Sequence, residues 1–163
     1  MAPLVDLRRY SVPIVPLRLV LGFVFLGAAR LAGVDPGPSA RLFGLGALLF
    51  ALAMLLSRRR RTFWVRAGEA TPIDAAAPIA AWAWTIARST YPSTLGVTGL
   101  AALALPFNPD LSALLGGILA GMGGVGAVFA IELLQWESRR GVRLMSTTGL
   151  KTKLYVRPTG GAA

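Results

Sequence analysis

Residues 111–134 read Leu111-Ser-Ala-Leu-Leu-Gly-Gly-Ile-Leu-Ala-Gly-Met-Gly-Gly-Val-Gly-Ala-Val-Phe-Ala-Ile-Glu-Leu-Leu134. Glu132 is the only ionisable residue in this apolar stretch. At 1.5 Å per residue, a helix of this length crosses the ~30 Å hydrocarbon core of a bilayer. The sequence therefore predicts a transmembrane helix over about residues 111–135.

The composition of the whole chain also favours a membrane protein. Of the 163 residues, 55% are hydrophobic, a further 19 residues are glycine, and the mean hydropathy is +0.62. Soluble domains are about 45–50% apolar when glycine is included in the count. One core in a soluble protein of this size could not bury so much apolar surface. We therefore expect lipid to solvate a large part of it.

Three further apolar runs precede residue 111. They predict spans over about residues 13–33, 38–57 and 92–107, of which the last is the weakest because it is rich in Ala and Gly. Breaker clusters at 34–38 and 106–110 predict tight turns, so the expected fold is an all-α integral membrane protein with four spans in two antiparallel hairpins. A cleaved signal peptide is the alternative for the first run, although that run exceeds the usual ~7–15-residue signal core.

The distribution of Lys and Arg predicts the orientation of these spans. The formal charge is +10, and with four spans only Arg30 and Arg41 fall on the side opposite the other basic loop residues. Both termini, the long loop 58–91 and a basic tail 142–163 are then cytoplasmic, with residues 1–141 forming the membrane domain. Fifteen of the 17 basic residues are Arg, which suggests a GC-rich bacterial genome and hence the bacterial inner membrane.

The predicted helix 111–135 carries small residues at four-residue spacing. Gly117 and Gly121 form a GxxxG pair, and Gly116, Ala120 and Gly124 lie beside them. Small residues let helix backbones approach closely and gain contacts that lipid tails do not supply. We expect this helix to be packed centrally, either against helices of this chain or against a partner.

Apart from Arg30 and Arg41, which lie next to the turn between the first two spans, two charged residues fall within the predicted spans. Arg18 falls one to two turns inside the first span, and Glu132 lies near the cytoplasmic end of the last. The predicted topology places both at comparable depth, and a charge at the bilayer centre costs about 2.5–3.5 kcal/mol on insertion scales. The sequence therefore predicts an intramembrane pair between Arg18 and Glu132. The alternative is that both side chains reach the headgroups separately.

The loop 58–91 begins with features of a lipid-headgroup anchor. Basic and aromatic residues directly after a span find partners in an anionic headgroup layer, and they are not expected to bind nucleic acid. The expected anchoring residues are Arg58, Arg59, Arg60, Arg61, Trp64, Arg66 and Trp82. Farther along, residues 74–88 predict a short amphipathic helix, capped by Asp74, that lies in the interface or docks on a partner.

The tail changes character after the last span. Between Val142 and Arg157, apolar and polar residues largely alternate on either side of Thr147-Thr148-Gly149, which predicts a β-hairpin. An isolated hairpin is only marginally stable in water. We therefore expect the tail to pair with another chain, to rest on the cytoplasmic loop, or to stay solvated as a basic segment.

The chain contains no Cys and no His. Thiolate nucleophiles, imidazole bases and the usual ligands of zinc, copper and haem iron are therefore missing from it, and glycine-rich nucleotide motifs are also absent. We expect no catalytic residues, no metal and no cofactor. The leading expectation is a non-catalytic structural, accessory or assembly subunit of a larger membrane complex, bound to anionic lipids and to other subunits or copies of itself. The alternative is a small homo-oligomeric transporter or lipid-handling protein.

Overall fold

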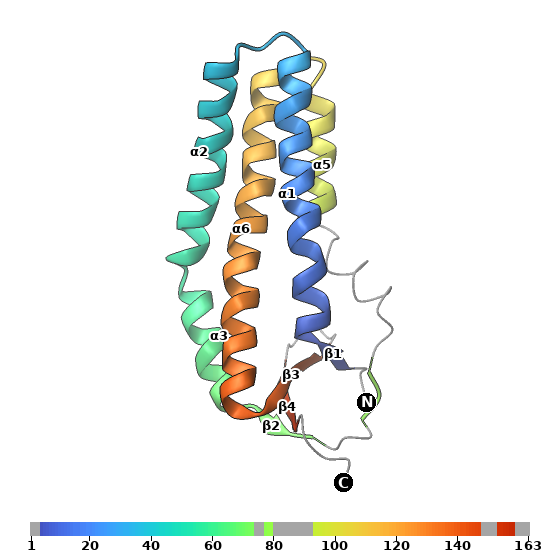
Figure 1. Cartoon of the computed structure of the whole chain (residues 1–163), viewed down its shortest axis with the longest axis vertical. Helices are drawn as coiled ribbons and strands as arrows, with labels where there is room; N and C mark the ends of the chain where they lie inside the picture. Colours follow the sequence, from blue (N-terminus) through green and yellow to red (C-terminus); the bar gives the residue numbers. More distant parts are fainter. Residues whose placement is uncertain (1–3, 74–76, 80–92, 148–152, 159–163) are drawn as a thin grey trace.

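A computed structural model describes residues 4–73, 77–79, 93–147 and 153–158 of the chain (Figure 1). The helices within these residues are α1 (Leu7–Leu31), α2 (Pro36–Leu55), α3 (Arg58–Gly68), α5 (Ser93–Ala104) and α6 (Pro109–Arg140). The strands are β1 (Leu4–Asp6), β2 (Thr71–Pro72), β3 (Val142–Thr147) and β4 (Leu154–Pro158). The strands form one small sheet at one end of an elongated helical bundle.

Three of the described helices, α1, α2 and α6, are long and apolar enough to cross a membrane. The chain is therefore mostly helical with three candidate spans, as the composition predicted at this level. Helix α5 is apolar, but its 12 residues rise only about 18 Å, which is less than the ~30 Å core of a bilayer. It is shorter than the span predicted over 92–107. Direction alternates from α1 to α2 and from α5 to α6 (Figure 1).

Helix α6 is the central element of the bundle. Both α1 and α2 pack mainly against α6 and have far fewer contacts with each other, while α5 packs against α6 near the end opposite the sheet. Figure 1 shows α6 lying between α1 and α2. The predicted central packing of this helix is therefore present, and its partners include helices of the same chain. The expectation that the first two long helices pair mainly with each other is wrong. Each of them packs mainly against α6.

Glycine permits the close contacts that α6 makes on two sides. Gly117 lies so close to α2 that an added Cβ would overlap the carbonyl oxygen of Phe43. A Cβ at Gly121 would lie 2.7 Å from the carbonyl oxygen of Ala47, also in α2. On the other side, a Cβ at Gly116 would lie 2.9 Å from the carbonyl oxygen of Gly22 in α1. Side chains at these positions would separate the helices and forfeit backbone contact.

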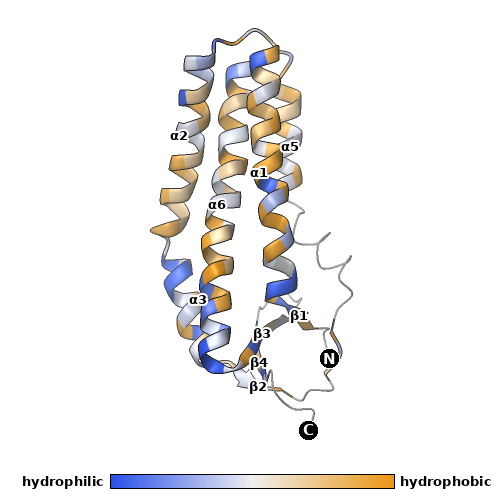
Figure 2. Ribbon diagram, in the orientation of Figure 1, coloured by the Kyte–Doolittle hydropathy of each residue, from blue (hydrophilic) through white to orange (hydrophobic). Residues whose placement is uncertain are grey.

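Helices α1 and α6 both extend beyond the spans predicted for them. Helix α1 begins at Leu7 rather than near residue 13, because the Asp6 side chain accepts hydrogen bonds from the first free N–H groups of the helix. Helix α6 continues to Arg140 and stops at Gly141, whose φ of 62° is a left-handed conformation suited to glycine. These extensions lie in the hydrophilic end of the molecule, below the apolar part of the bundle (Figure 2).

The sheet has the strand order β1-β3-β4-β2. Strands β3 and β4 are antiparallel, with Leu144 opposite Val156, so the hairpin predicted for the tail is present. Strand β1 adds antiparallel to β3, with Asp6 opposite Met145, and β2 adds parallel to β4. The expectation of an all-α fold is therefore wrong at this end. Of the alternatives for the tail, the structure shows it resting on the chain's own N-terminal segment and loop.

The contact between Gly117 and Phe43 makes a testable prediction. Gly117→Ala should lower the free energy of unfolding of the isolated chain by about 1–3 kcal/mol, because the added methyl group overpacks a backbone contact. Gly124→Ala is the matched control on the same helix, since nothing lies within 4 Å of a Cβ at that position. Thermal unfolding in detergent would measure both variants. Equal midpoints for the two would contradict the packing of α6 on α2.

Candidate functional site

The cationic side chains gather at the end of the bundle that carries the sheet, which is the hydrophilic end in Figure 2. Those with described side chains are Arg8, Arg9, Arg58, Arg60, Arg61, Arg66, Arg139, Arg140, Arg143, Lys153 and Arg157. Arg30 and Arg41 lie at the other end, on either side of the turn between α1 and α2. Because β1 pairs with β3, the first and last described segments meet at the same basic end.

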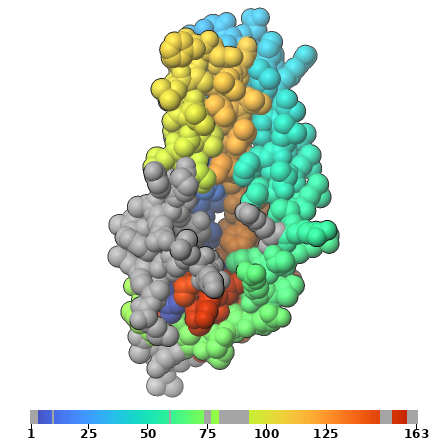
Figure 3. All heavy atoms as spheres, turned by 180° about the vertical axis from the view of Figure 1, so that it is seen from behind, coloured from blue at the N-terminus to red at the C-terminus, as the bar shows by residue number. Residues whose placement is uncertain are grey.

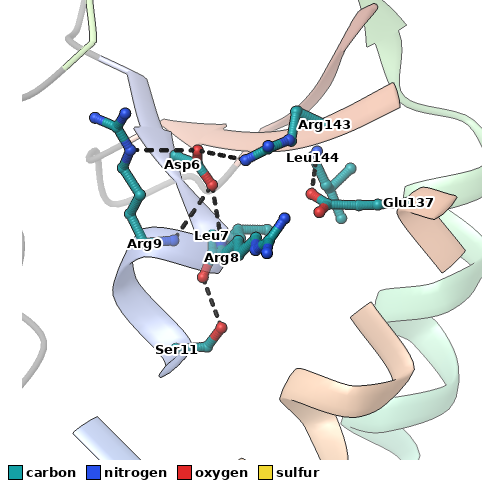
Figure 4. A network of polar contacts seen from close by, with 8 residues as sticks. All are labelled: Asp6, Leu7, Arg8, Arg9, Ser11, Glu137, Arg143 and Leu144. Carbon is teal, nitrogen blue, oxygen red and sulfur yellow. Dashed lines mark hydrogen bonds and ion pairs between the residues drawn. The ribbon is translucent and has the colours of Figure 1, made fainter. Parts of the chain in front are cut away.

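A buried carboxylate, Asp6, joins β1, α1 and β3 (Figure 4). Only 6% of Asp6 is exposed, and its Oδ1 accepts the backbone N–H of Arg8 at 2.9 Å. Its Oδ2 lies 3.6 Å from a guanidinium nitrogen of Arg143 in β3. One side chain thus caps the first membrane-length helix and holds the tail strand beside it. A capping carboxylate also interacts favourably with the positive end of the helix dipole.

A second buried carboxylate, Glu137, joins the end of α6 to the same sheet. Its Oε1 accepts the backbone N–H of Leu144 at 2.8 Å, and only 5% of the residue is exposed (Figure 4). Glu137 lies beyond the predicted span 111–135. Burial raises the pKa of this carboxyl above its ordinary value, and Asp6 adds to the increase, while the Leu144 hydrogen bond and the nearby Arg143 and Arg8 oppose it.

Helix α3 packs its aromatic residues against the lower part of α6. The rings of Phe63 and Phe129 have centroids 5.1 Å apart, and Trp64 lies 5.7 Å from Phe129 and 6.5 Å from Trp136. The guanidinium carbon of Arg140 lies 4.7 Å from the centroid of the Trp136 ring. Trp64, predicted as a headgroup anchor, therefore contributes to a packed aromatic cluster. Such pairs add about 0.5–1.5 kcal/mol beyond area burial.

The structure does not bring the predicted pair Arg18 and Glu132 together. Glu132 is paired with Arg60 of α3, while Arg18 donates from Nε to the hydroxyl oxygen of Thr94 in α5 at 2.9 Å. The prediction is corrected in depth as well as in direction. Leu19, next to Arg18, lies beside Gly123 of α6, and Glu132 follows nine residues later, about 13 Å farther along the helix. Helix α3 follows α2 towards the sheet end, beside the lower part of α6 (Figure 1), and places Arg60 at the carboxylate.

A cavity of about 390 Å³ lies just beyond the N-terminal end of α5. Arg18 and Arg60 both line it, together with Ser93 and apolar side chains of α2 and α6. Figure 3 shows this side of the molecule, which is hollowed between the end of α5 and the region of α2 and α3. Among the described residues, α5 is much shorter than α6 and does not reach the lower part of α6 on this side.

The remaining predicted site residues fall into separate groups. Arg58, Arg61 and Arg66 are exposed on α3, as an anchoring role requires. Gly124 is exposed on α6 with nothing within 4 Å of a Cβ, whereas Ala120 is buried. The side chain of Arg59, the residue Trp82 and most of the predicted interfacial helix 74–88 lie outside the residues that the structure describes.

The described residues contain no group of three or more acidic residues arranged to hold a metal ion. What the basic end offers chemically is guanidinium groups beside apolar walls, an arrangement suited to binding anions at a membrane surface. Comparisons with protein families, with curated proteins and with solved structures find no match to this chain. The class that the fold defines is therefore a mostly helical protein with three helices able to span a membrane.

The buried state of Glu137 makes a pH-dependent prediction. Because its folded pKa lies above its unfolded value, its contribution to stability is full below the unfolded pKa and is lost as the pH rises through the folded pKa. The stability of the wild type minus that of Glu137→Gln should therefore fall as the pH rises above the ordinary pKa of a glutamate carboxyl. Glu137→Ala should cost about 1–3 kcal/mol by leaving the Leu144 N–H without its acceptor. Unfolding of the detergent-solubilised chain at several pH values would measure this, and a pH-independent difference would contradict it.

The pair between Arg60 and Glu132 predicts energetic coupling. Arg60→Gln should destabilise the chain more than the double variant Arg60→Gln/Glu132→Gln, because the single change leaves a half-buried carboxylate without its cation. A double-mutant cycle in detergent should give a coupling energy of about 1 kcal/mol. Arg61→Gln, an exposed neighbour on α3, should change stability by less than about 0.5 kcal/mol. Additive effects of the two changes would contradict the pairing.

Proposed function

We propose that this chain is a non-catalytic integral membrane protein that serves as a structural, accessory or assembly subunit of a larger membrane complex. Its place is the bacterial inner membrane, with both termini and the sheet on the cytoplasmic side. The observation that carries the proposal is an uncovered face of α6, formed by Gly124, Val128 and Ile131. All three residues are exposed, and they follow one another at helical spacing.

The position of this face favours a helix of another subunit as its neighbour. At 100° per residue, Gly124 lies between the side of α6 that contacts α1 and the side that contacts α2. The chain's own helices use glycine at Gly116 and Gly117 for close backbone approach. Gly124 repeats that pattern one to two turns farther on but has no neighbour within 4 Å. A glycine at this position is unfavourable in a helix facing lipid, and it suits a closely packed helix.

The outward surface of α2 supports the same proposal. In the most apolar 18-residue stretch of α2, only 11% is buried inside the molecule, whereas the corresponding share in α6 is 44%. Exposed leucines cover that surface: Leu45, Leu48, Leu49 and Leu52. Lipid would solvate such a surface, and a membrane partner would bury it equally well. The non-catalytic part of the proposal rests on the sequence, which has neither Cys nor His.

The orientation rests on charge and on the position of the chain ends. Both terminal segments belong to one sheet, so the number of membrane crossings between them is even. That end carries most of the described arginines, and positive residues favour the cytoplasmic side of short loops. Four crossings would require the shorter helix α5 to complete a span together with its flanking residues.

The test is co-purification from native membranes in a mild detergent. A fixed stoichiometry of other membrane subunits with this chain supports the proposal. Gly124→Leu should lose those subunits, because the larger side chain fills the uncovered face. It should leave the chain itself folded, since nothing lies within 4 Å of the new Cβ.

Gly27→Leu is the matched control for this experiment. Gly27 is also exposed in a membrane-length helix with nothing within 4 Å of a Cβ, but it lies on α1, outside the surfaces proposed for a partner. This variant should retain the co-purifying subunits. Equal retention by both variants, or a chain that purifies alone, would contradict the proposal. A homo-oligomer that moves lipid or protons would instead support the second candidate, a transporter or lipid-handling protein, for which the cavity beside Arg18 is the supporting observation.

A further inference from the structure

The cavity beyond α5 combines two kinds of lining that rarely occur together. Its walls are apolar over most of their extent and include Phe50, Met54, Val125 and Phe129. Two guanidinium groups, those of Arg18 and Arg60, also line it. A volume of about 390 Å³ falls within the range of ~300–1,000 Å³ that is typical of ligand pockets. The ligand that fits this lining has a negative group attached to an apolar chain.

Both arginines are held in place by groups of the chain itself. Thr94 accepts from Nε of Arg18, and Glu132 accepts from Nε and Nη2 of Arg60. The two acceptors belong to α5 and α6. They hold the two guanidinium groups in place at the cavity. Guanidinium groups that are already oriented lose less side-chain freedom when they bind an anion.

The cavity extends from the end of α2 to the middle of α6, that is, from Leu55 and Arg60 to Met122. Arg60 belongs to the first turn of α3, directly after the membrane-length helix α2 ends at Leu55. Arg18 lies deeper along α1, so the cationic lining extends from the interface towards the apolar part of the bundle. Basic pockets between membrane helices on the cytoplasmic side suit the headgroups of anionic lipids.

From these observations we propose that the cavity binds one anionic phospholipid of the cytoplasmic leaflet. Its phosphate accepts hydrogen bonds from Arg18 and Arg60, and the start of an acyl chain lies against Phe50, Val125 and Phe129. This site shares Val128 with the partner surface on α6, but its lining includes neither Gly124 nor Ile131.

Native mass spectrometry of the purified full chain, with any subunits that remain bound to it, tests the proposal. The probes are phosphatidylglycerol, phosphatidylcholine and a free fatty acid, each added at the same concentration. Phosphatidylglycerol should bind at least about tenfold more tightly than phosphatidylcholine. Arg18→Gln should remove most of this preference, because a hydrogen bond to a charged group contributes about tenfold or more in affinity.

Matched variants separate a built site from general surface charge. Arg61→Gln removes one exposed charge from α3 outside the cavity lining and should retain the preference. Val125→Trp fills the cavity without changing charge and should reduce binding of phosphatidylglycerol. Leu111→Trp adds the same ring at an exposed position elsewhere on α6 and should not. Thermal unfolding of each variant shows whether the fold is kept.

Three results would overturn the proposal. The first is equal binding of phosphatidylglycerol and phosphatidylcholine to the wild type. The second is an equal loss in Arg61→Gln and Arg18→Gln, which would reduce the effect to unspecific electrostatics. The third is binding of the fatty acid with no preference for phosphatidylglycerol, which would assign the cavity to a free carboxylate. None of these results bears on co-purification of subunits through Gly124, so the two proposals fail separately.

Discussion

The close backbone contact between α6 and its two long neighbours determines how the rest of the molecule is arranged. At Gly117 the backbone of α2 occupies the space that any side chain would need, and Gly116 does the same for α1. In lipid there is no hydrophobic force that brings helices together, so packing of this kind has to supply the association. Because α6 receives a helix on each side, α1 and α2 are kept apart for most of their length.

The unequal lengths of the helices follow from this central position. Helix α6 has 32 residues and α5 has 12, so the part of α6 nearest the sheet needs other neighbours. Helix α3 covers one side through Phe63 and Trp64, and the sheet covers the end through Leu144. Two places stay uncovered among the described residues: the cavity lined by Arg18 and the exposed face at Gly124. The cavity arises where α6 extends beyond the shorter helix α5, whereas the face at Gly124 lies between α1 and α2.

Sequence periodicity predicted the features that span many residues. Apolar runs predicted α1, α2 and α6, and the alternation of apolar and polar residues predicted the hairpin of β3 and β4. Strand β1 has only three residues, too few for an alternating pattern. Helix α3 was missed because its four arginines suggested only an anchor, although the spacing of Phe63 and Ala67 was a usable helical signal.

The error over Arg18 and Glu132 has a different physical origin. Sequence position fixes how deep a residue lies along a helix, since each residue adds 1.5 Å. It fixes neither the register between two helices nor the direction in which a side chain leaves its helix towards a neighbour. Leu19 lies beside Gly123 of α6, so Arg18 and Glu132 differ in depth. Glu132 faces the side of α6 on which α3 packs, and Arg18 faces α5. The glycine contacts could be anticipated because small residues mark packed faces wherever the neighbour lies.

Because the sheet pairs the tail with other segments of the chain, we expect a partner to contact the membrane helices rather than the tail. Strand β3 is paired on both sides, by β1 and β4, and the free edge of the sheet at β1 is itself in contact with Pro78 through the Leu4 N–H. Such short, occupied edges offer a partner strand few backbone groups to pair with. Asp6 and Glu137 hold the tail further, through Arg143 and Leu144. A partner that recognises this protein therefore finds more uncovered apolar surface along α2 and α6 than at the tail.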